Sequence, residues 1–204
     1  MALTDGPLSW GEEAELLQRI DLDEQRPEWM PSREDIDACL LETRGARILV
    51  TGSESWEDKR AIAASLKRAL KYLSMDPEQT TLIHGASAGA DTLAAGVGRR
   101  LGMAIESHRP EWSKHSESCP RQQPADGGCW AGRSSCMRGG FRRNREMVES
   151  GADILVAFIR DRSPGATDAL ELWLQRDRPA ILCRQDDGDS SVSGEFLNME
   201  RWRD

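Results

Sequence analysis

From residue 47 onward, short apolar runs alternate with longer amphipathic stretches. The apolar runs at 47–51, 80–84, 104–108, 153–158 and 179–183 are rich in β-branched and aliphatic residues, and such runs predict buried strands. The stretches at about 56–73, 88–101, 142–150 and 166–175 have helical spacing. Strands separated by helices of this length imply right-handed crossovers. The sequence therefore predicts a doubly wound α/β domain over 45–184, with a mostly parallel five-stranded sheet.

The ends of the chain follow a different pattern. Segment 1–44 contains two shorter helical patterns, at 9–20 and 32–42, and Ser9 with Glu12 forms a capping-box sequence before the first. We interpret 1–44 as an acidic helical arm that packs on the domain or on a second subunit; the alternative is a partly disordered acidic tail. The tail at 185–204 starts polar and ends in apolar residues, which we expect to dock on the surface.

Composition narrows the class of protein. A chain of 204 residues with 38% hydrophobic content buries one good-sized core with extensions. There is no apolar run of membrane-spanning length and no basic stretch followed by an apolar one at the N-terminus. We therefore expect a cytoplasmic protein with no membrane partner. Five cysteines, an odd number, favour thiols or metal ligands over a disulfide framework.

The net charge of −8 is unevenly distributed. Residues 1–45 contain 12 acidic and 4 basic side chains, whereas 109–145 contains 8 basic and 3 acidic ones. The basic middle segment indicates either attraction to the acidic arm or an anionic ligand. It also favours single-stranded nucleic-acid binding as another class of function, although the acidic arm and the overall charge oppose that class.

Small and polar residues gather where the predicted strands end. The first strand stops at Gly52 and Ser53, and the second ends in a His-Gly-Ala-Ser-Ala-Gly-Ala-Asp run from His84 to Asp91. A tight turn before a helix presents unpaired N–H groups to an anion, and the carboxyl ends of parallel strands meet at one edge of a sheet. In the second turn we expect Gly85 and Gly89 to admit a ligand and His84 and Asp91 to contact it; the alternative for Asp91 is a helix cap.

Two further segments belong to the same predicted edge. Arg143 and Asn144 open the third helix, where an Arg-Asn pair can hold phosphate and ribose; alternatively, this charge run is a solvated face. Helical periodicity places Phe141 and Met147 inward. The run at 163–168, with Gly165 and Thr167, supplies a third small-residue turn. The spacing is not G-x-G-x-x-G, so we expect neither a nicotinamide nor a flavin cofactor.

Taken in order, these motifs resemble a known family. Val-Thr-Gly-Ser at 50–53, His-Gly-x-x-x-Gly-Ala-Asp at 84–91, Arg-Asn-x-x-Met at 143–147, Gly-Ala-Asp at 151–153 and Ser-Pro-Gly-Ala-Thr at 163–167 are similar to the SLOG superfamily, in the branch related to YspA and YpsA. The resemblance covers 47–183 and implies a Rossmann-like fold and a nucleotide-derived ligand. It also implies a homodimer, and an origin in bacteria, often actinobacteria, or their phages.

The resemblance also suggests an activity. Lonely Guy phosphoribohydrolases of this superfamily cleave nucleoside monophosphates with Arg-Lys-x-x-Met and Pro-Gly-Gly-x-Gly-Thr-x-x-Glu motifs, which implies Arg143 and Glu146 as candidate catalytic residues. Here Asn144 replaces the lysine, the second motif lacks a glycine, and its carboxylate position holds Leu170, with Glu171 one residue late. Glycosidic-bond cleavage passes through a positively charged, oxocarbenium-like transition state. Without a carboxylate at the right position, this transition state lacks its main electrostatic stabilisation. Sensing, hydrolysis and non-catalytic binding of a partner protein therefore remain open.

The segment at 109–141 carries a separate chemical feature. His115, Cys119, Cys129 and Cys136 form a His-x3-Cys-x9-Cys-x6-Cys series in a polar loop, which favours a structural zinc site because thiolate and imidazole ligands fasten a loop that has no core of its own. The spacing lacks the tight Cys-x-x-Cys pair of common zinc fingers. The alternative is three unrelated thiols in a flexible loop.

Overall fold

The computed structural model describes residues 32, 39, 44–125, 128–136, 138–160, 163–185 and 192–198. The chain divides into two units, Met1–Arg44 and Gly45–Asp204. The helix predicted at 9–20, nearly all of the one predicted at 32–42, and the chain after residue 198 lie outside the described residues. The second unit contains the strands and helices from Ala46 onward.

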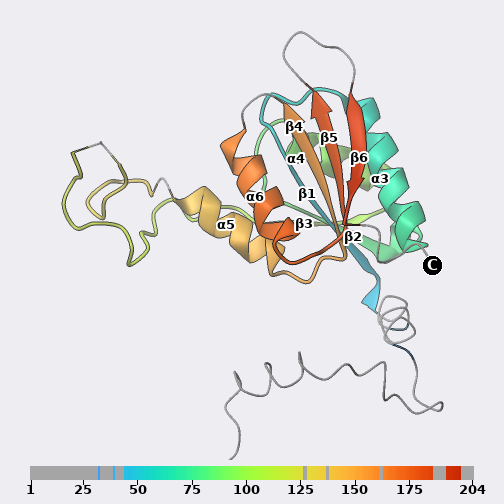
Figure 1. Ribbon diagram of the computed structural model, residues 1–204, viewed down its shortest axis with the longest axis horizontal. Coiled ribbons are helices and arrows are strands. Elements are labelled where there is room, and N and C mark those ends of the chain that lie inside the picture. Colours follow the sequence, from blue (N-terminus) through green and yellow to red (C-terminus); the bar gives the residue numbers. More distant parts are fainter. Residues whose placement is uncertain are drawn as a thin grey trace, which may run out of the picture. The chain divides into compact units, whose positions relative to one another are not determined.

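A mostly parallel sheet of six strands forms the centre of this unit, in the order β3-β2-β1-β4-β5-β6 (Figure 1). Its strands are β1 (Ala46–Gly52), β2 (Thr80–His84), β3 (Ala104–Ser107), β4 (Ile154–Arg160), β5 (Ala180–Gln185) and β6 (Ser193–Leu197). The first five run parallel, and β6 pairs antiparallel with β5. The predicted α/β architecture is confirmed, but the sheet has six strands where we predicted five.

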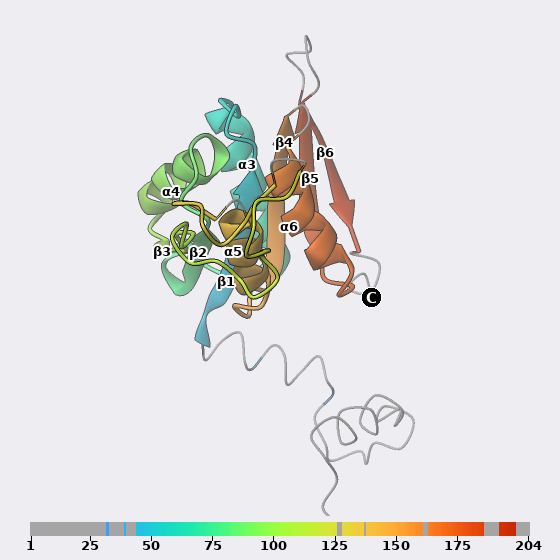
Figure 2. The same ribbon diagram turned by 90° about the vertical axis from the view of Figure 1, so that its left-hand side faces the viewer.

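The helices cover both faces of the sheet (Figure 2). They are α3 (Lys59–Leu73), α4 (Ala90–Leu101), α5 (Gly139–Val148) and α6 (Pro164–Leu174), with a short 3-10 helix at Pro77–Gln79. The helices α3 and α4 enclose one half of the core with β-strand residues such as Ile48 and Phe158. The other half lies under α5 and α6, around Leu49 and Trp173. Among the described parts of the chain, none of the helices has the length and apolar character that crossing a membrane requires.

Two local expectations differ from the structure. The first helix begins at Lys59 instead of Trp56, because the Asp58 carboxylate accepts hydrogen bonds from Arg60 N (2.8 Å) and Ala61 N (2.9 Å) and caps the helix there. Trp56 instead lies in the preceding turn and packs on the Phe158 ring, with 5.2 Å between centroids. Phe141 was predicted to point inward but is 48% exposed, because it lies in the first turn of α5, which extends beyond the sheet (Figure 1).

Candidate functional site

The turn after β1 is fastened to two neighbouring elements by Ser53. Its backbone N–H donates to Phe158 O (2.8 Å), and its hydroxyl donates to Arg160 O (3.0 Å) and accepts from Arg160 N (2.8 Å). The Ser53 carbonyl accepts from Ala90 N at the start of α4 (3.2 Å). With an exposed fraction of 2%, Ser53 therefore joins β1, β4 and α4 and has little capacity left for a ligand.

The glycines of the first two turns make room for protein atoms. A methyl group added at Gly52 would come within 2.7 Å of Phe158 O and would also overlap the Ala90 side chain. Gly89 has φ +66°, which favours glycine, and a methyl group there would strike the carbonyl groups of Ser53 and Glu54. The first two turns therefore pack against each other, and this contact fills the space that we predicted for a ligand.

His84, at the end of β2, is buried with one ring nitrogen unsatisfied. Its Nδ1 accepts a hydrogen bond from Ala86 N (3.1 Å), so the proton of the neutral ring lies on Nε2. That Nε2 is buried and has no hydrogen-bond partner among the described residues. Burial lowers the pKa of His84, and the positive charges of Arg99 and Arg143 lower it further. The ring is therefore neutral at pH 7 and presents an unused donor.

Asp91 lies in the first turn of α4 and is 4% exposed. Its Oδ2 accepts from Ser87 N (3.2 Å), so part of its role is to fasten its own turn, as the capping alternative proposed. Burial raises the pKa of Asp91 to about 6, although the Ser87 N–H and the charge of Arg143 act in the opposite direction. A carboxyl group that titrates near neutral pH is suited to proton transfer.

Arg143 and Asn144 connect the second turn to the start of α6. Arg143 donates from Nη1 to Gly85 O and to His108 O (3.4 Å), and its Nε donates to Asn144 Oδ1 (3.1 Å). Its guanidinium group occupies the space beside the Gly85 Cα where a methyl group would lie. Burial lowers the pKa of Arg143, and the charge of Asp91 raises it; at neutral pH the group stays charged.

Asn144 completes this connection. It is 2% exposed, and its Nδ2 donates to Gly165 O (2.8 Å) and to Asp168 Oδ2 (2.9 Å). Both ends of its amide are therefore used within the protein. The sequence predicted that Asn144 contacts a ligand, whereas the structure shows it positioning Arg143 and α6. Sequence reasoning missed Asp168 as its partner, although Asp168 directly follows Thr167 in the third turn.

The start of α6 is the most open part of the predicted cradle. Among the described residues, no side chain caps this helix and a methyl group added at Gly165 would meet nothing within 4 Å; Pro164 occupies the first turn. Thr167, four residues beyond the Ser163 cap position, is partly buried. The uncapped N–H groups of this turn, including that of Gly165, provide the anion-binding geometry of a helix N-terminus.

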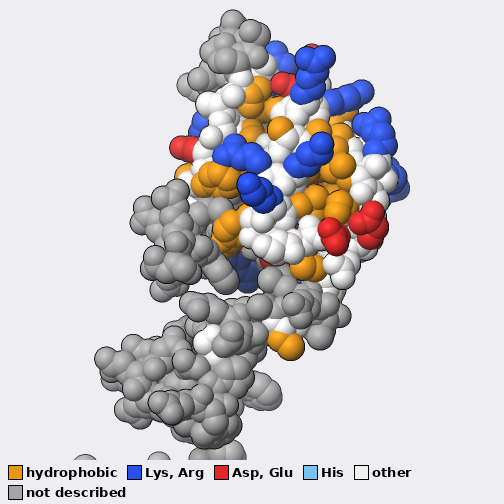
Figure 3. Space-filling view, turned by 90° about the vertical axis from the view of Figure 1, so that its right-hand side faces the viewer, with side chains coloured by type: hydrophobic (Ala, Val, Ile, Leu, Met, Phe, Trp, Pro, Cys, Tyr) orange, Lys and Arg blue, Asp and Glu red, His pale blue; other side chains and the backbone are white. Residues whose placement is uncertain are grey.

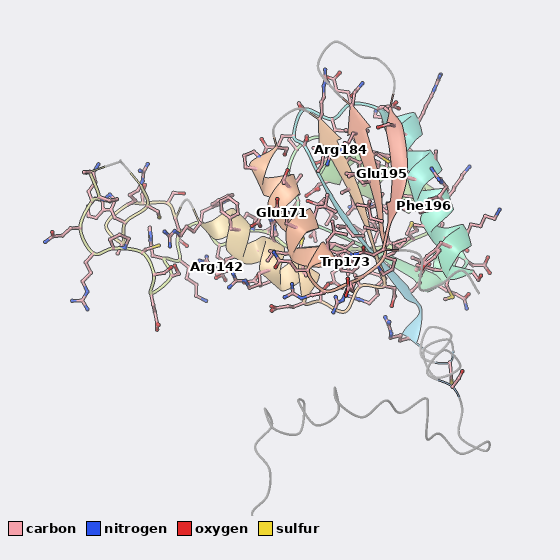
Figure 4. The ribbon with its side chains drawn as sticks, in the orientation of Figure 1. Arg142, Glu171, Trp173, Arg184, Glu195 and Phe196 are labelled. Carbon is pink, nitrogen blue, oxygen red and sulfur yellow. The ribbon has the colours of Figure 1, made fainter. Side chains whose placement is uncertain are left out.

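The candidate carboxylates of the hydrolase hypothesis lie on the surface. Glu146 on α5 and Glu171 on α6 are both exposed, and Figure 4 places Glu171 in the middle of α6, away from its first turn. A separate depression of about 500 Å³ lies beside α4, and its lining includes Glu54, Glu57 and Lys59. Two carboxylates oppose an anion there, so the depression is less suited to phosphate than the start of α6.

The predicted metal ligands converge in the loop between β3 and α5. His115, Cys119, Cys129 and Cys136 place one ligand atom each within 4.8 Å of one another. The three sulfur–sulfur distances are 3.8, 3.9 and 3.8 Å, and Cys129 Sγ lies 3.6 Å from His115 Nδ1. The three thiols are buried in a cluster of their own. This group has the donors and the spacing to hold a metal ion.

A second contact orients the histidine of this cluster. His115 Nε2 lies 3.0 Å from Arg133 O, and donation to that carbonyl leaves Nδ1 unprotonated and directed at the sulfurs, as in known metal sites. A hydrogen bond from Ser116 is the largest cause that lowers the pKa of the Cys119 thiol to about 6. Both effects favour the deprotonated ligands that a cation needs.

The strand order and the strand-end turns define a doubly wound, Rossmann-like α/β protein. Residues 46–115 match the model of the YspA, cpYpsA-related SLOG family. The Gene 61 protein of Mycobacterium phage D29 is 32% identical over 140 residues, which cover 66% of this chain and 94% of that protein. The chain belongs to the YspA, cpYpsA-related SLOG family, as its motifs predicted, and a phage protein is among its relatives.

A solved structure is also similar to this chain. DNA processing protein A from Streptococcus pneumoniae has a TM-score of 0.46 and 16% sequence identity, and the match covers 67% of this chain. It spans half of that protein.

Proposed function

We propose that the strand-end edge binds a phosphorylated nucleotide or nucleotide-derived ligand, with Arg143 and the start of α6 as its centre. The observation that carries this proposal is the hydrogen-bonded connection from Gly85 through Arg143 and Asn144 to Gly165. This connection holds the Arg143 guanidinium group and the uncapped N-terminus of α6 at the edge of the sheet where α/β folds bind ligands. Membership of a SLOG family supports a nucleotide-related role.

Individual predicted residues have different roles in this proposal. Arg143, the backbone N–H of Gly165 and the Thr167 hydroxyl hold phosphate, while His84 Nε2 and Asp91 are the candidates to contact a sugar or base. Gly52, Ser53 and Gly89 shape the edge from behind, because each is packed against protein atoms. Asn144 keeps Arg143 in place.

The direct test is ligand binding by the full chain. Thermal shift and calorimetry against nucleoside mono- and diphosphates, ADP-ribose and cyclic nucleotides should identify at least one ligand that raises Tm. Arg143→Ala should weaken its binding at least about tenfold, because a charge-assisted contact to phosphate is lost. Arg100→Ala removes the same charge from an exposed position on α4 and should leave affinity unchanged. If no nucleoside phosphate or cyclic nucleotide binds, the proposal is wrong.

Turnover separates a sensor from a hydrolase. A phosphoribohydrolase would release free base from a nucleoside monophosphate, and Arg143 with Glu146 or Asp91 would carry the reaction. Glu146 is exposed and Asp91 already accepts a hydrogen bond from Ser87 N in its own turn, so we favour binding without cleavage. Base release by the native protein that is lost in Arg143→Ala would establish the hydrolase instead.

We also propose that the Cys/His cluster holds a structural zinc ion. Zinc–sulfur bonds of ~2.3 Å and zinc–nitrogen bonds of ~2.05 Å at tetrahedral angles require sulfur–sulfur distances of ~3.8 Å and sulfur–nitrogen distances of ~3.6 Å. The distances between the thiols and between Cys129 and His115 agree with these values to within 0.1 Å. When bound, zinc would clip the loop through His115, Cys119, Cys129 and Cys136.

Metal analysis tests the zinc proposal. Protein purified without added zinc should contain about one equivalent, and less than about half an equivalent counts against a structural site. Cys136→Ser should lose the metal and become sensitive to trypsin within the loop, where Arg121 and Arg133 are exposed. Cys39→Ser, which changes an exposed thiol outside the cluster, should keep both the metal and the protease resistance.

Two further expectations complete the proposal. We propose that the chain acts in the cytoplasm of a bacterium or of a phage-infected cell, which the phage relative supports. We also propose a homodimer in which residues 1–44 contribute to the contact. Light scattering of the full chain after size-exclusion chromatography tests the dimer, and a monomeric mass at micromolar concentration would contradict it.

A further inference from the structure

The loop between β3 and α5 and the first turn of α5 each present one large aromatic side chain to solvent. Trp112 is 49% exposed and Phe141 is 48% exposed, and both lie in or beside the basic segment 109–145. Neither ring takes part in the strand-end site or in the Cys/His cluster. Exposed apolar side chains that occur together, unlike single ones, mark a surface that binds a ligand or a partner.

Trp112 is held in place from both ends of the loop. Its carbonyl accepts a hydrogen bond from Cys136 N (2.5 Å), which couples its backbone to one of the four candidate metal ligands. Its ring lies over the first turn of α5, since methyl groups added at Gly139 and Gly140 would come within 3.0 and 3.5 Å of it. The glycines immediately before Phe141 therefore form a flat seat for the indole.

Arg142 fixes the same region from the helix side. Its Nη2 donates to Glu111 O (2.9 Å) and to Lys114 O (3.0 Å), on either side of Trp112 in the sequence. Figure 4 shows Arg142 at the end of α5 from which the loop leaves the domain. The indole and the phenyl ring of Phe141 are thus presented on a rigid base, which lowers the entropy cost of binding.

The charge around these rings is positive. Arg109, Lys114, Arg121, Arg133, Arg138 and Arg145 are all exposed in this segment. Exposed acidic side chains are fewer, and one of them, Glu111, pairs with Lys114 at 3.5 Å. Exposed aromatic rings among arginines match a polymer with stackable bases and a charged backbone, because stacking tolerates every base and arginine contacts phosphate.

We propose that this aromatic-basic surface, formed by Trp112, Phe141 and the surrounding exposed arginines, binds single-stranded nucleic acid. Bases stack on the two rings, and the backbone follows the arginines of the loop. The Cys/His cluster holds the loop in one conformation and so keeps the aromatic-basic surface in place. This proposal does not depend on nucleotide binding at the strand ends, because Arg143 and the start of α6 take no part in it.

A second basic surface provides the comparison. The helix α3 contains five basic residues and no acidic one, and Lys and Arg side chains surround apolar atoms on the face that includes α3 and β6 (Figure 3). Its exposed aromatic residue, Phe196, is 39% exposed but is covered by the Arg68 guanidinium at 4.2 Å from the ring centroid. A base that stacks on this face of Phe196 must first displace the guanidinium group, which makes Phe196 a matched control.

The test is fluorescence anisotropy of labelled dT20 with the full chain at 50 and 200 mM salt. Binding should weaken as salt rises, because phosphate contacts release counterions. Phe141→Ala should weaken it about tenfold, the effect of one lost stacking contact, and Trp112→Ala at least as much. Phe196→Ala should bind like the native chain. Because Phe141 is exposed, its removal leaves the fold intact, and circular dichroism checks this.

Four results would overturn the proposal. The first is the absence of dT20 binding at 50 mM salt up to about 100 μM protein, the upper range of non-specific affinities, which would leave a protein partner as the explanation for the exposed rings. The second is an equal loss in Phe196→Ala and Phe141→Ala, which would move binding to the α3 face. The third is unchanged binding in Phe141→Ala and Trp112→Ala. Competition by a mononucleotide that Arg143→Ala abolishes would place the oligonucleotide at the strand-end site instead.

Discussion

Asn144 offers the sharpest test of how the strand-end edge is assembled. Its side chain is 2% exposed and makes three hydrogen bonds, to Gly165 O, to the Asp168 carboxylate and from Arg143 Nε, at 2.8, 2.9 and 3.1 Å. Asn144→Ala removes all three at once. The carbonyl of Gly165 and the two charged groups then depend on water for replacement partners.

The size of the effect depends on the kinds of bond lost. A neutral hydrogen bond contributes ~1 kcal/mol net and one to a charged group ~1.5–3 kcal/mol. Arg143 and Asp168 are only partly buried, so water recovers part of the two charged bonds. We therefore expect Asn144→Ala to lower the free energy of unfolding by ~3 kcal/mol.

Urea unfolding followed by circular dichroism measures this loss. Glu146→Ala, on the exposed side of the same helix, should change stability by no more than ~0.5 kcal/mol. In a double-mutant cycle, Asn144→Ala and Asp168→Ala should show a coupling of ~1 kcal/mol or more, because they remove opposite ends of one bond. A loss below ~1 kcal/mol in Asn144→Ala, or strictly additive effects, would refute the role that we give Asn144.

Two other predictions concern the turns. Gly52→Ala should destabilise the chain by ~3 kcal/mol, because the new methyl group meets Phe158 O at 2.7 Å; a urea midpoint equal to that of the native chain would contradict this. Gly165→Ala, in open space within α6, should be neutral or stabilising by up to ~1 kcal/mol; a lower urea midpoint would contradict this. The pKa of Asp91 is raised to about 6, above the ~3.9 of an unfolded Asp, so the folded state binds more protons between these values and Asp91 costs stability as pH rises from about 4 to 6. Asp91→Asn should therefore gain stability relative to the native chain between pH 5 and pH 7.5 by ~1.4 kcal/mol, because only about half of the pKa shift lies above pH 5; a difference independent of pH in urea titrations would show that Asp91 does not titrate in that window.

The sequence alone determined the features that depend on neighbouring residues or on the chemistry of a residue type. Strand β2 was predicted with the bounds that it has, Thr80–His84. The polar turn residues on either side of this short run mark where the strand begins and ends. The four residues of the Cys/His cluster were predicted to lie together, because few other roles bring one histidine and three cysteines into a polar loop. The family was recognisable from the order of short motifs.

Only the tertiary structure decided what depends on distant parts of the chain. Strand β6 needs β5 as its partner, and its exposed residues carry little of the hydrophobic pattern that marks a strand. Gly52 and Gly89 indicated space for a ligand, but residues brought from other turns fill that space. Asn144 indicated a ligand contact, yet Asp168 and Gly165, more than 20 positions away, take up its amide. The residue type determines which groups a side chain can bind, but the packing of the folded chain determines which of those groups lies next to it.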